Sequence, residues 1–482
     1  MSSMGADRVE RSLARVLGRA SLLASLALLS ACNSEAAPES PLPKDRSDWS
    51  LVVLLLDALP ATGVGAWGYP LDVTPNLDAL AEESVRFDQA YAGASYTLAS
   101  VSSLFTGLSP EGHGVVGLST NVLGARHETL AETFRGRGFA TGGFSSNPHI
   151  TKAGGFHQGF DEFRHYGRDK LGYHGISQAL QDDSLEWWRA HEGERRLLYV
   201  HVLPPHQPYD AAEPHASMFG ADKTERELGF TEYLVKADKE GTVERDSQLA
   251  RDIRARYDAG VHQADEFVGS FLETLRESPG GAKTAFCVVS DHGEAFGEHG
   301  RLLHGSTVFN EMTHVPLILS WPGGQASVVE ELVSTVNLAP TLCELFDMPF
   351  EHGESFLSAV WTDYQSPPVL SRTVGNAPVW SVRTEHWTFQ RQSEKRIRLL
   401  YDRRNDRGET IELLAPGTNL EVEGEQVVTA KELEIHAQRL AKILRRELIE
   451  QRRLSKGIRP GRDDTHSAGV EDLGYVGDEE DQ

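Results

Sequence analysis

The chain is poor in cysteine and in basic residues for its length. Of its 482 residues 3 are cysteine, and 47 Lys and Arg stand against 71 Asp and Glu, for a formal net charge of -24. So few thiols exclude a disulfide-stapled scaffold. The acidic balance argues against nucleic acid as a partner. Cys287 and Cys343 lie in apolar runs, where we expect buried thiols and no disulfide.

The sequence has no internal repeat, and its N-terminal apolar stretch, residues 21–31, is too short for a mature membrane-spanning helix. Arginines at positions 8, 11, 15 and 19 precede this stretch, which ends in LSAC. The pattern resembles a bacterial lipoprotein signal peptide over residues 1–32, with Cys32 as the lipidated residue. A plain secretory signal with a chance cysteine is the alternative. We therefore expect a lipid-anchored protein of the bacterial cell envelope, periplasmic or at the outer membrane or cell surface.

Beyond a polar, proline-bearing tether at residues 33–48, apolar runs alternate with helical patterns. Continuous apolar runs are typical of strands buried on both faces of a parallel sheet. This alternation predicts an α/β domain over residues 49–365, with a mainly parallel sheet covered by helices. The predicted strands lie at 50–56, 139–145, 195–203, 283–290 and 315–321, and helical patterns include 128–138 and 248–278.

The alternation stops after about residue 365. Residues 379–409 predict two or three antiparallel strands, within a small C-terminal subdomain over 366–428 whose many arginines we expect on a solvated face. An amphipathic helix follows at 429–455, where Thr429 and Glu432 predict a capping box. The remaining residues, 456–482, read as an acidic tail.

Acidic and imidazole side chains follow two of the predicted strands. Asp57 comes directly after the first strand, and Asp291 and His292 follow the strand at 283–290. Ligands collect beyond the carboxyl ends of parallel strands, and two carboxylates with an imidazole suit a divalent cation. Capping and core roles are the alternative. Thr97 opens a helix of small residues that Gly107 can close, either as a helix cap or as a nucleophile beside free N–H groups.

Four segments of the chain carry a pattern of their own: residues 54–92, 103–115, 288–319 and 333–349. Together they resemble the sulfatase family of the alkaline-phosphatase superfamily. The resemblance implies an alkaline-phosphatase-like α/β/α sandwich with a mixed, mainly parallel sheet and a small antiparallel C-terminal subdomain. It also implies a sulfatase-like, metal-dependent hydrolase of sulfuric or phosphoric esters, acting on a sulfated or phosphorylated glycan, lipid or small molecule.

The family pattern assigns roles to individual residues of this chain. Calcium sulfatases usually have Asn where His292 stands, and a second aspartate where this chain has Ala58. Both departures favour one zinc or manganese ion, with calcium still possible. His149 is as fair a choice as Asn147, and His113 has a turn-shaping role as its alternative. The implied metal ligands are Asp57, Thr97, Asp291 and His292; the catalytic groups are Thr97, His206 and His304; and the substrate-binding groups are Asn147, His149 and His113.

Thr97 occupies the position whose Cys or Ser becomes formylglycine in working sulfatases. Ala99 fits the proline-or-alanine position of that motif, but Thr97 replaces its Cys or Ser and Val101 replaces its arginine, so we expect no formylglycine. A threonine alkoxide remains possible and favours phosphorus over sulfur, because a threonyl sulfate has no easy exit. The alternatives are a non-catalytic surface lipoprotein that binds an anionic glycan and a phosphoethanolamine-type transferase. We expect His201 to be a satisfied core histidine and Glu294 to support a site residue.

Overall fold

A large mixed sheet forms the centre of the fold. The computed structural model describes residues 41–117, 122–167, 172–220, 227–362, 364–375, 377–392, 394, 396–416, 420–422 and 426–455. The eight strands of this sheet are β1 (Ser50–Leu56), β2 (Val85–Tyr91), β3 (Ala140–Ser145), β4 (Glu162–His165), β5 (Arg196–Val202), β6 (Thr284–Ser290), β9 (Leu317–Ser320) and β10 (Ser327–Ser334). They pair in the order β10-β2-β9-β6-β1-β5-β3-β4.

The sheet is mainly parallel, as expected. Strand β9 runs antiparallel to β2 and β6, whereas β1 pairs in parallel with both β5 and β6. The helices around the sheet are α2 (Pro75–Glu83), α3 (Thr97–Thr106), α4 (Pro110–His113), α5 (Leu130–Gly136), α6 (Gly172–Ala190), α7 (Thr231–Glu240), α8 (Gln248–Glu277), α9 (Asn310–Thr313) and α10 (Leu338–Leu345). Short 3-10 turns are η1 (Ala61–Gly63), η2 (Gly65–Trp67), η3 (His215–Ser217), η5 (Gly281–Lys283), η6 (Glu298–Gly300), η7 (Thr335–Asn337) and η8 (Leu357–Val360), and β7 (Ala295–Phe296) pairs with β8 (Leu302–Leu303).

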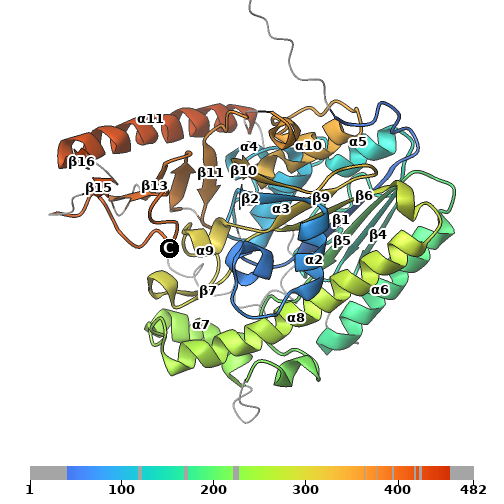
Figure 1. Cartoon of the computed structure of the whole chain (residues 1–482), viewed down its shortest axis with the longest axis horizontal. Helices are drawn as coiled ribbons and strands as arrows, with labels where there is room; N and C mark the ends of the chain where they lie inside the picture. Colours follow the sequence, from blue (N-terminus) through green and yellow to red (C-terminus); the bar gives the residue numbers. More distant parts are fainter. Residues whose placement is uncertain are drawn as a thin grey trace, which may run out of the picture. The chain divides into compact units, whose positions relative to one another are not determined.

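Helices cover both faces of the sheet because successive side chains of each strand point to opposite faces. Leu51, Val53 and Leu55 of β1 belong to one apolar core, which α3, α5 and α10 share. Val52 and Leu54 belong to the other core, which α2, α6 and α8 share. Figure 1 shows these two sets of helices on either side of the strands. The expected α/β/α sandwich is therefore confirmed.

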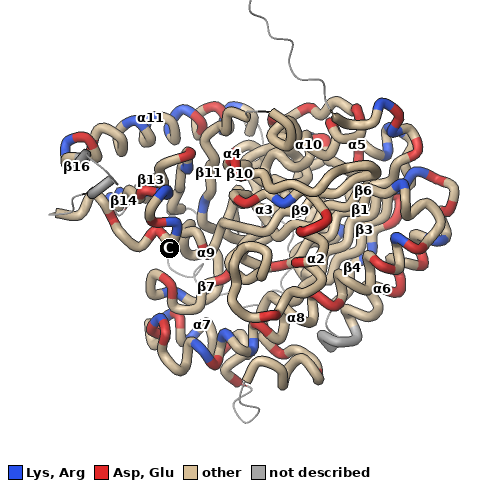
Figure 2. Tube along the Cα trace, viewed as in Figure 1, with Lys and Arg blue, Asp and Glu red and all other residues tan. Residues whose placement is uncertain are grey.

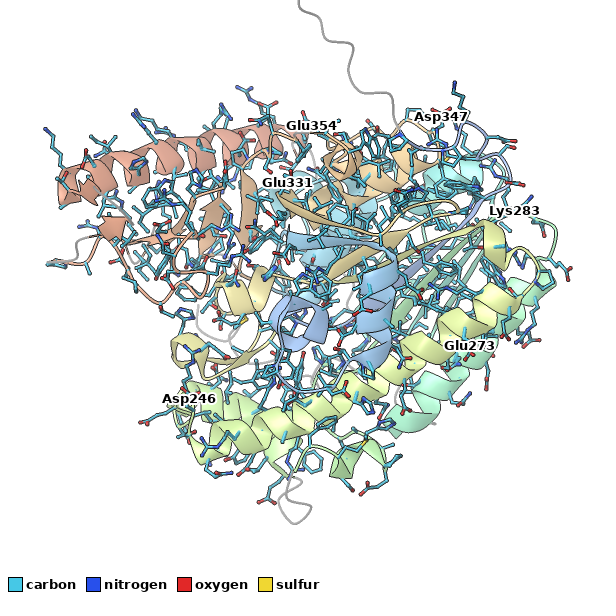
Figure 3. The ribbon with its side chains drawn as sticks, in the orientation of Figure 1. Asp246, Glu273, Lys283, Glu331, Asp347 and Glu354 are labelled. Carbon is cyan, nitrogen blue, oxygen red and sulfur yellow. The ribbon has the colours of Figure 1, made fainter. Side chains whose placement is uncertain are left out.

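Charge is distributed as this layering requires. Figure 2 shows acidic and basic residues of both signs along α6, α8 and the C-terminal helix, whereas β1 and β6 carry none. The charged side chains labelled in Figure 3, among them Glu273 on α8, lie on the outside of the fold. Buried carboxylates in the interior are thus exceptional and call for a physical explanation.

The smaller C-terminal sheet is antiparallel and carries its own core. Its four strands are β11 (Val369–Arg372), β12 (Trp380–Arg383), β13 (Trp387–Gln392) and β14 (Ile397–Asp402), in that order. A two-stranded ribbon, β15 (Leu420–Val422) and β16 (Gln426–Val428), precedes α11 (Ala430–Leu454). The capping box of Thr429 and Glu432 forms at the start of α11. Leu433 and Leu440 of α11 pack on the sheet with Val382, Phe389 and Leu400.

The arginines of this subdomain are in part buried, contrary to the expectation of a solvated face. Arg383 is 0% exposed and forms an ion pair with Glu409 at 3.1 Å. Arg372 is buried as well and pairs with Glu111 of α4 at 3.1 Å. Arg383 also donates to the carbonyl of Val308 at 2.6 Å, so both arginines join the small sheet to the main domain. A buried guanidinium needs a partner charge and several acceptors.

Several sequence expectations concern parts of the chain outside the described residues. They are the signal peptide with Cys32, tether residues 33–40 and the acidic tail at 456–482. The last tether residues are described, and Arg46 donates to the Leu345 carbonyl at 2.9 Å. Among the described residues, no helix is long and apolar enough to cross a membrane. Cys287 and Cys343 are buried free thiols, as expected.

Candidate active site

Two strand ends bring three predicted metal ligands together. Leu56, the last residue of β1, is level with Ser290, the last residue of β6, so Asp57 and Asp291 emerge at the same edge of the sheet. His292 Nε2 lies 3.6 Å from Asp57 Oδ1 and 3.5 Å from Asp291 Oδ2. Exposure of the three residues is 1% or less. The fold therefore concentrates two carboxylates and an imidazole in one buried cluster.

Thr97 enters this cluster from the first residue of α3. Its Oγ1 lies 3.1 Å from His292 Nε2. The N-cap position belongs to Tyr96, whose side chain makes no capping hydrogen bond, and Gly107 ends the helix in the left-handed conformation as expected. Thr97 is thus not a helix cap. The first N–H groups of a helix have no partner within it. The N-terminal start of α3 therefore offers hydrogen-bond donors beside the Thr97 hydroxyl.

Asp57 is held in place by two hydrogen-bond donors, one from the loop after β3 and one from β5. Asn147, in the loop after β3, donates from Nδ2 to Asp57 Oδ2, and His201 of β5 lies with Nε2 3.1 Å from the same oxygen. Tyr199 Oη lies 3.1 Å from His201 Nδ1 and completes a chain of hydrogen bonds. Burial alone would raise the pKa of Asp57, but nearby His206 and the hydrogen bond from His201 lower it overall.

Asp291 responds in the opposite direction. Burial and the neighbouring charge of Asp57 raise the pKa of Asp291. The backbone N–H of Ala58 donates to Asp291 Oδ1 at 3.2 Å, and Ala58 adopts a positive φ of 56° to do so. Such a backbone is uncommon for a residue other than glycine. Two carboxylates this close cannot both ionise without a compensating positive charge.

Two further imidazole rings, those of His304 and His206, lie beside the cluster. The ring of His304 lies 4.2 Å from that of His292 and 4.8 Å from that of His206, between centroids. His304 Nδ1 lies 3.0 Å from Glu294 Oε1. Burial raises the pKa of Glu294 to about 8 and lowers the pKa of His304 to about 4. Near neutral pH the Glu294 carboxyl therefore holds a proton and donates it to Nδ1 of the neutral His304 ring. Glu294 thus supports a site residue, as expected.

The two histidines predicted to bind substrate, His113 and His149, are both buried. His113 accepts from Val115 N–H at Nδ1, at 3.1 Å, and its Nε2 lies 3.0 Å from Ser103 Oγ. Both ring nitrogens are thus engaged by the protein, which fits the turn-shaping alternative. His149 is 2% exposed, and its backbone N–H donates to Asn147 Oδ1 at 2.7 Å. Contact of His113, His149 or Asn147 with substrate stays a prediction.

His201 is the site residue that sequence reasoning left out. It was expected to be a satisfied core histidine, and its ring is indeed hydrogen-bonded, but the bond goes to Asp57. The signal available beforehand was that His201 comes near the end of a predicted strand that could neighbour the strand before Asp57. In the sheet His201 is level with Leu55 of β1, two residues before Asp57, and this register brings its ring to the Asp57 carboxylate.

The residues of the cluster fit a divalent cation. Asp57 Oδ1 and Asp291 Oδ2 are buried, and no described residue donates a hydrogen bond to either. His292 Nδ1 lies 2.9 Å from the Gly293 carbonyl and donates to it, so its Nε2 carries a lone pair. One ligand atom from each residue lies within 4.8 Å of the others. Two orphaned carboxylate oxygens and an imidazole lone pair are the donor set of a borderline metal such as zinc or manganese.

Comparisons with known proteins agree with this geometry. The sulfatase family model matches residues 50–348. An arylsulfatase of Clostridium perfringens is 24% identical over 389 residues, which are 65% of this chain and 80% of that protein. A solved 2-O GAG sulfatase superimposes with a TM-score of 0.68 at 19% identity, over 87% of this chain and 96% of its own.

A phosphonate monoester hydrolase of Agrobacterium radiobacter superimposes with a TM-score of 0.65 at 19% identity, over 83% of this chain and 96% of its own. These structural likenesses show the shared fold, and the family model covers more than half of this chain. The chain therefore belongs to the sulfatase family of alkaline-phosphatase-like proteins, a family of metal-dependent ester hydrolases.

Proposed function

We propose that this protein hydrolyses phosphoric or phosphonic esters with unmodified Thr97 as the nucleophile. The observation that carries the proposal is the contact of 3.1 Å between Thr97 Oγ1 and His292 Nε2, beside two buried carboxylates. A hydroxyl in that position is placed to attack an ester whose charge the site compensates.

A threonine cannot follow the route of the formylglycine sulfatases. Its Cβ bears a methyl group, so oxidation of its alcohol gives a ketone and not the aldehyde hydrate on which that route depends. The hydroxyl itself must then act. Asp57, Asp291 and His292, together with Thr97, would hold the cation. When bound, a divalent cation lowers the pKa of a neighbouring hydroxyl and offsets negative charge, so no dedicated base is required.

The other side chains supply positioning and a proton. The N–H groups at the start of α3 hold the non-bridging oxygens of the ester. Thr97 Oγ1 loses its proton to solvent water and forms a bond to phosphorus while the bond from phosphorus to the leaving oxygen breaks. His304 gives that oxygen its Nε2 proton while the Glu294 carboxyl passes its own proton to His304 Nδ1, so the ring stays neutral and Glu294 becomes a carboxylate. Water then attacks phosphorus and gives a proton back to the His304–Glu294 pair, while the bond from phosphorus to Thr97 Oγ1 breaks. His206, whose ring lies 4.8 Å from that of His304, is the alternative proton donor.

Phosphorus is favoured over sulfur on chemical grounds. A threonyl phosphate can be hydrolysed by in-line attack of water at phosphorus. A threonyl sulfate cannot release sulfate by collapse of a hemiacetal, which is the step that an aldehyde hydrate makes possible. The similarity in fold to a phosphonate monoester hydrolase supports this direction, and the similarity to a GAG sulfatase keeps sulfated glycans among the substrates to be tested.

The test compares the wild type with Thr97→Val and Thr97→Ser, each loaded with zinc or manganese. Valine keeps the branched shape without the hydroxyl, and serine keeps the hydroxyl. With 4-nitrophenyl phosphate, phenylphosphonate monoester and sulfate as substrates, we expect turnover of the phosphorus esters. Thr97→Val should lose on the order of a thousandfold or more, and Thr97→Ser should keep most of the rate. Equal rates for Thr97→Val would remove Thr97 from the mechanism. Binding of a sulfated glycan without turnover would instead favour the non-catalytic alternative.

We also propose that Cys32 carries the lipid that attaches the protein to the bacterial envelope. The LSAC sequence and the arginines before it support this location. Expression of the full chain and of Cys32→Ala, followed by detergent phase partitioning, tests it. The wild type should enter the detergent phase, and Cys32→Ala should stay in the aqueous phase. Equal partitioning would rule out the anchor.

A further inference from the structure

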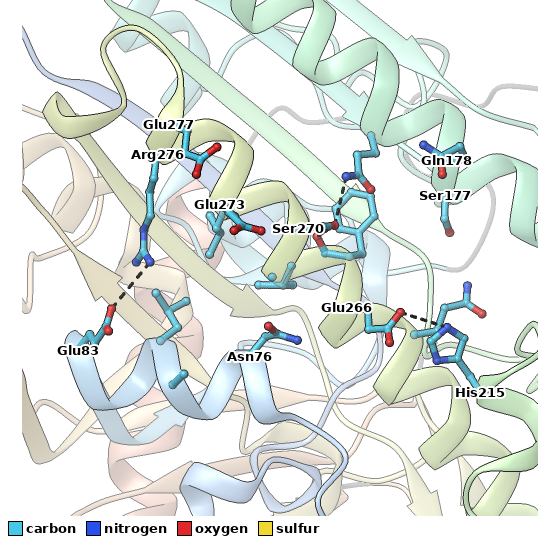
Figure 4. Close-up of a pocket in the computed structure, with 18 residues that line it drawn as sticks. Asn76, Glu83, Ser177, Gln178, His215, Glu266, Ser270, Glu273, Arg276 and Glu277 are labelled. Atoms are coloured by element: carbon cyan, nitrogen blue, oxygen red, sulfur yellow. Dashed lines mark hydrogen bonds and ion pairs between the residues drawn. The ribbon is translucent and has the colours of Figure 1, made fainter.

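A second group of metal-ligating side chains lies on α8, away from the cluster at the strand ends. His262 and Glu266 are four residues apart on this helix and so share one face. His215, from η3, faces them. One ligand atom from each of the three lies within 4.8 Å of the others. Figure 4 shows the Glu266 carboxylate turned toward the His215 ring.

The separations within this group are those of ligands around a shared ion. His215 Nε2 lies 3.5 Å from Glu266 Oε2, and His262 Nε2 lies 3.8 Å from Glu266 Oε1. Both exceed the length of an N–H···O hydrogen bond. Two ligands at zinc distances in tetrahedral geometry are about 3.4 Å apart. Because the Glu266 side chain is 58% exposed and can rotate, a small movement brings all three atoms to bonding distance.

The imidazole ring of His262 is already oriented. His262 Nδ1 lies 3.2 Å from the carbonyl of Val73 and donates to it, which leaves the lone pair on Nε2. A backbone carbonyl on the far nitrogen is the usual support of a metal-binding histidine. The ring of His262 packs against those of His215 and Phe219, at 5.4 and 5.6 Å between centroids. Both histidines are less than 10% exposed.

An acidic cavity leads to the group. It has a volume of about 900 Å³, and His215 and Glu266 line it. Of its charged lining residues, four are glutamates and one is an arginine, so its field attracts a cation. The charged residues are Glu83, Glu266, Glu273, Glu277 and Arg276. The cavity also has room for water molecules that complete the coordination of an ion.

We propose that His215, His262 and Glu266 form a second metal site that binds zinc independently of the site at Asp57. Two imidazoles and one carboxylate are the ligands of a borderline divalent cation, and zinc takes three protein ligands with water in the remaining position. The site joins η3 to α8. Gln263 of α8 already accepts from the N–H of Ala212 in the same segment at 2.9 Å. The metal thereby fixes the loop that leaves β5 and carries His206.

The test measures zinc binding of the full chain after removal of metal by chelation and dialysis. Isothermal titration and metal analysis after gel filtration are made on the wild type, Glu266→Gln and Glu273→Gln. Glu273→Gln is the matched control, because it removes the same charge from the same helix and cavity without removing a ligand. We expect Glu266→Gln to weaken one zinc site at least about a hundredfold and to lower the melting temperature in zinc, with Glu273→Gln like the wild type.

The same measurements in an Asp57→Asn background separate this site from the proposed active site. Asp57→Asn should keep one equivalent of zinc, and the double variant Asp57→Asn with Glu266→Gln should lose it. If the active site holds no ion, the wild type binds one equivalent that Glu266→Gln abolishes and Asp57→Asn does not. Equal zinc affinity and stoichiometry for Glu266→Gln and Glu273→Gln would overturn the proposal.

Discussion

Thr97 Oγ1 and His292 Nε2 lie 3.1 Å apart, and the same nitrogen lies within 3.6 Å of both carboxylates of the site. Since His292 Nδ1 donates to the Gly293 carbonyl, Nε2 holds the only lone pair of the ring. That lone pair can bind a cation or accept the proton of Thr97, but it cannot do both at once. The roles of metal ligand and general base are therefore alternatives that experiment can separate.

The metal role of His292 predicts that activity depends completely on an added ion. Chelator-treated protein should show no turnover of 4-nitrophenyl phosphate, and zinc or manganese should restore it. His292→Asn replaces an imidazole by an amide oxygen, so zinc affinity should fall roughly 10- to 1,000-fold while calcium competes better. Titration of both ions against both proteins measures this. Full activity after chelation would make His292 a base and end the metal interpretation.

The contact between Glu294 and His304 predicts a dependence on the leaving group. His304 Nδ1 lies 3.0 Å from Glu294 Oε1, and a proton donor accelerates departure of a poor leaving group more than that of a good one. Glu294→Gln should slow an alkyl phosphonate ester about 10- to 100-fold and the 4-nitrophenyl ester much less. Steady-state rates on the two esters test this.

The control for that prediction is the pair of single variants and their combination. If Glu294 acts through His304, the double variant with His304→Gln should be no slower than His304→Gln alone, because residues that act as a unit are not additive. The idea fails if Glu294→Gln slows both esters by the same factor.

Asn147 is expected to orient a metal ligand. Its Nδ2 donates to Asp57 Oδ2, and its Oδ1 accepts from the N–H of His149. Asn147→Ala should therefore weaken metal affinity about 10- to 100-fold. At saturating metal, KM should stay close to that of the wild type. A raised KM under those conditions would show direct contact with substrate, the role first expected for Asn147. Tyr199→Phe, which alters the other support of Asp57 through His201, should have a smaller effect in the same direction.

Much of the sheet could be predicted because its central strands are uniformly buried. The runs that became β1 and β6 contain no charged residue, and every residue in them is buried. Strands nearer the edge were missed. In β10, Val328 is half-exposed and acidic residues interrupt the apolar pattern, and β2 follows α2 so closely that its residues read as a continuation of the helix. A strand that is buried on both faces is a continuous apolar run and can be predicted from the sequence, whereas a strand near the edge of the sheet lacks that run.

The site divides in the same way. Asp57, Asp291 and His292 could be grouped from the sequence because they follow strands whose carboxyl ends share an edge. The contact of His201 with Asp57 depends on the register between β5 and β1, which no local pattern encodes. The group of His215, His262 and Glu266 was also beyond reach, since 46 residues separate the first two by sequence number and only the packing of η3 on α8 joins them. Contacts made by strand order are predictable, whereas those made by register and loop packing are not.

His113 gives a prediction about pH and stability. Burial lowers the pKa of His113 to about 3, and the nearby groups His127 and Arg372 lower it further. A second ring proton would also displace the N–H of Val115 from Nδ1. The unfolded chain takes up that proton near pH 6.5. The folded chain does so only near its lower pKa, so the stability from neutral His113 is present above pH 6.5 and is lost as pH falls.

His113→Gln should lower the free energy of unfolding by about 1–2 kcal/mol at pH 7. Its decline from pH 6.5 to 4 should also become shallower by up to about 1.4 kcal/mol per pH unit. Urea unfolding at several pH values measures both, and kcat/KM at pH 7.5 should stay within about threefold. A KM raised tenfold with an unchanged pH slope would instead assign His113 to substrate binding.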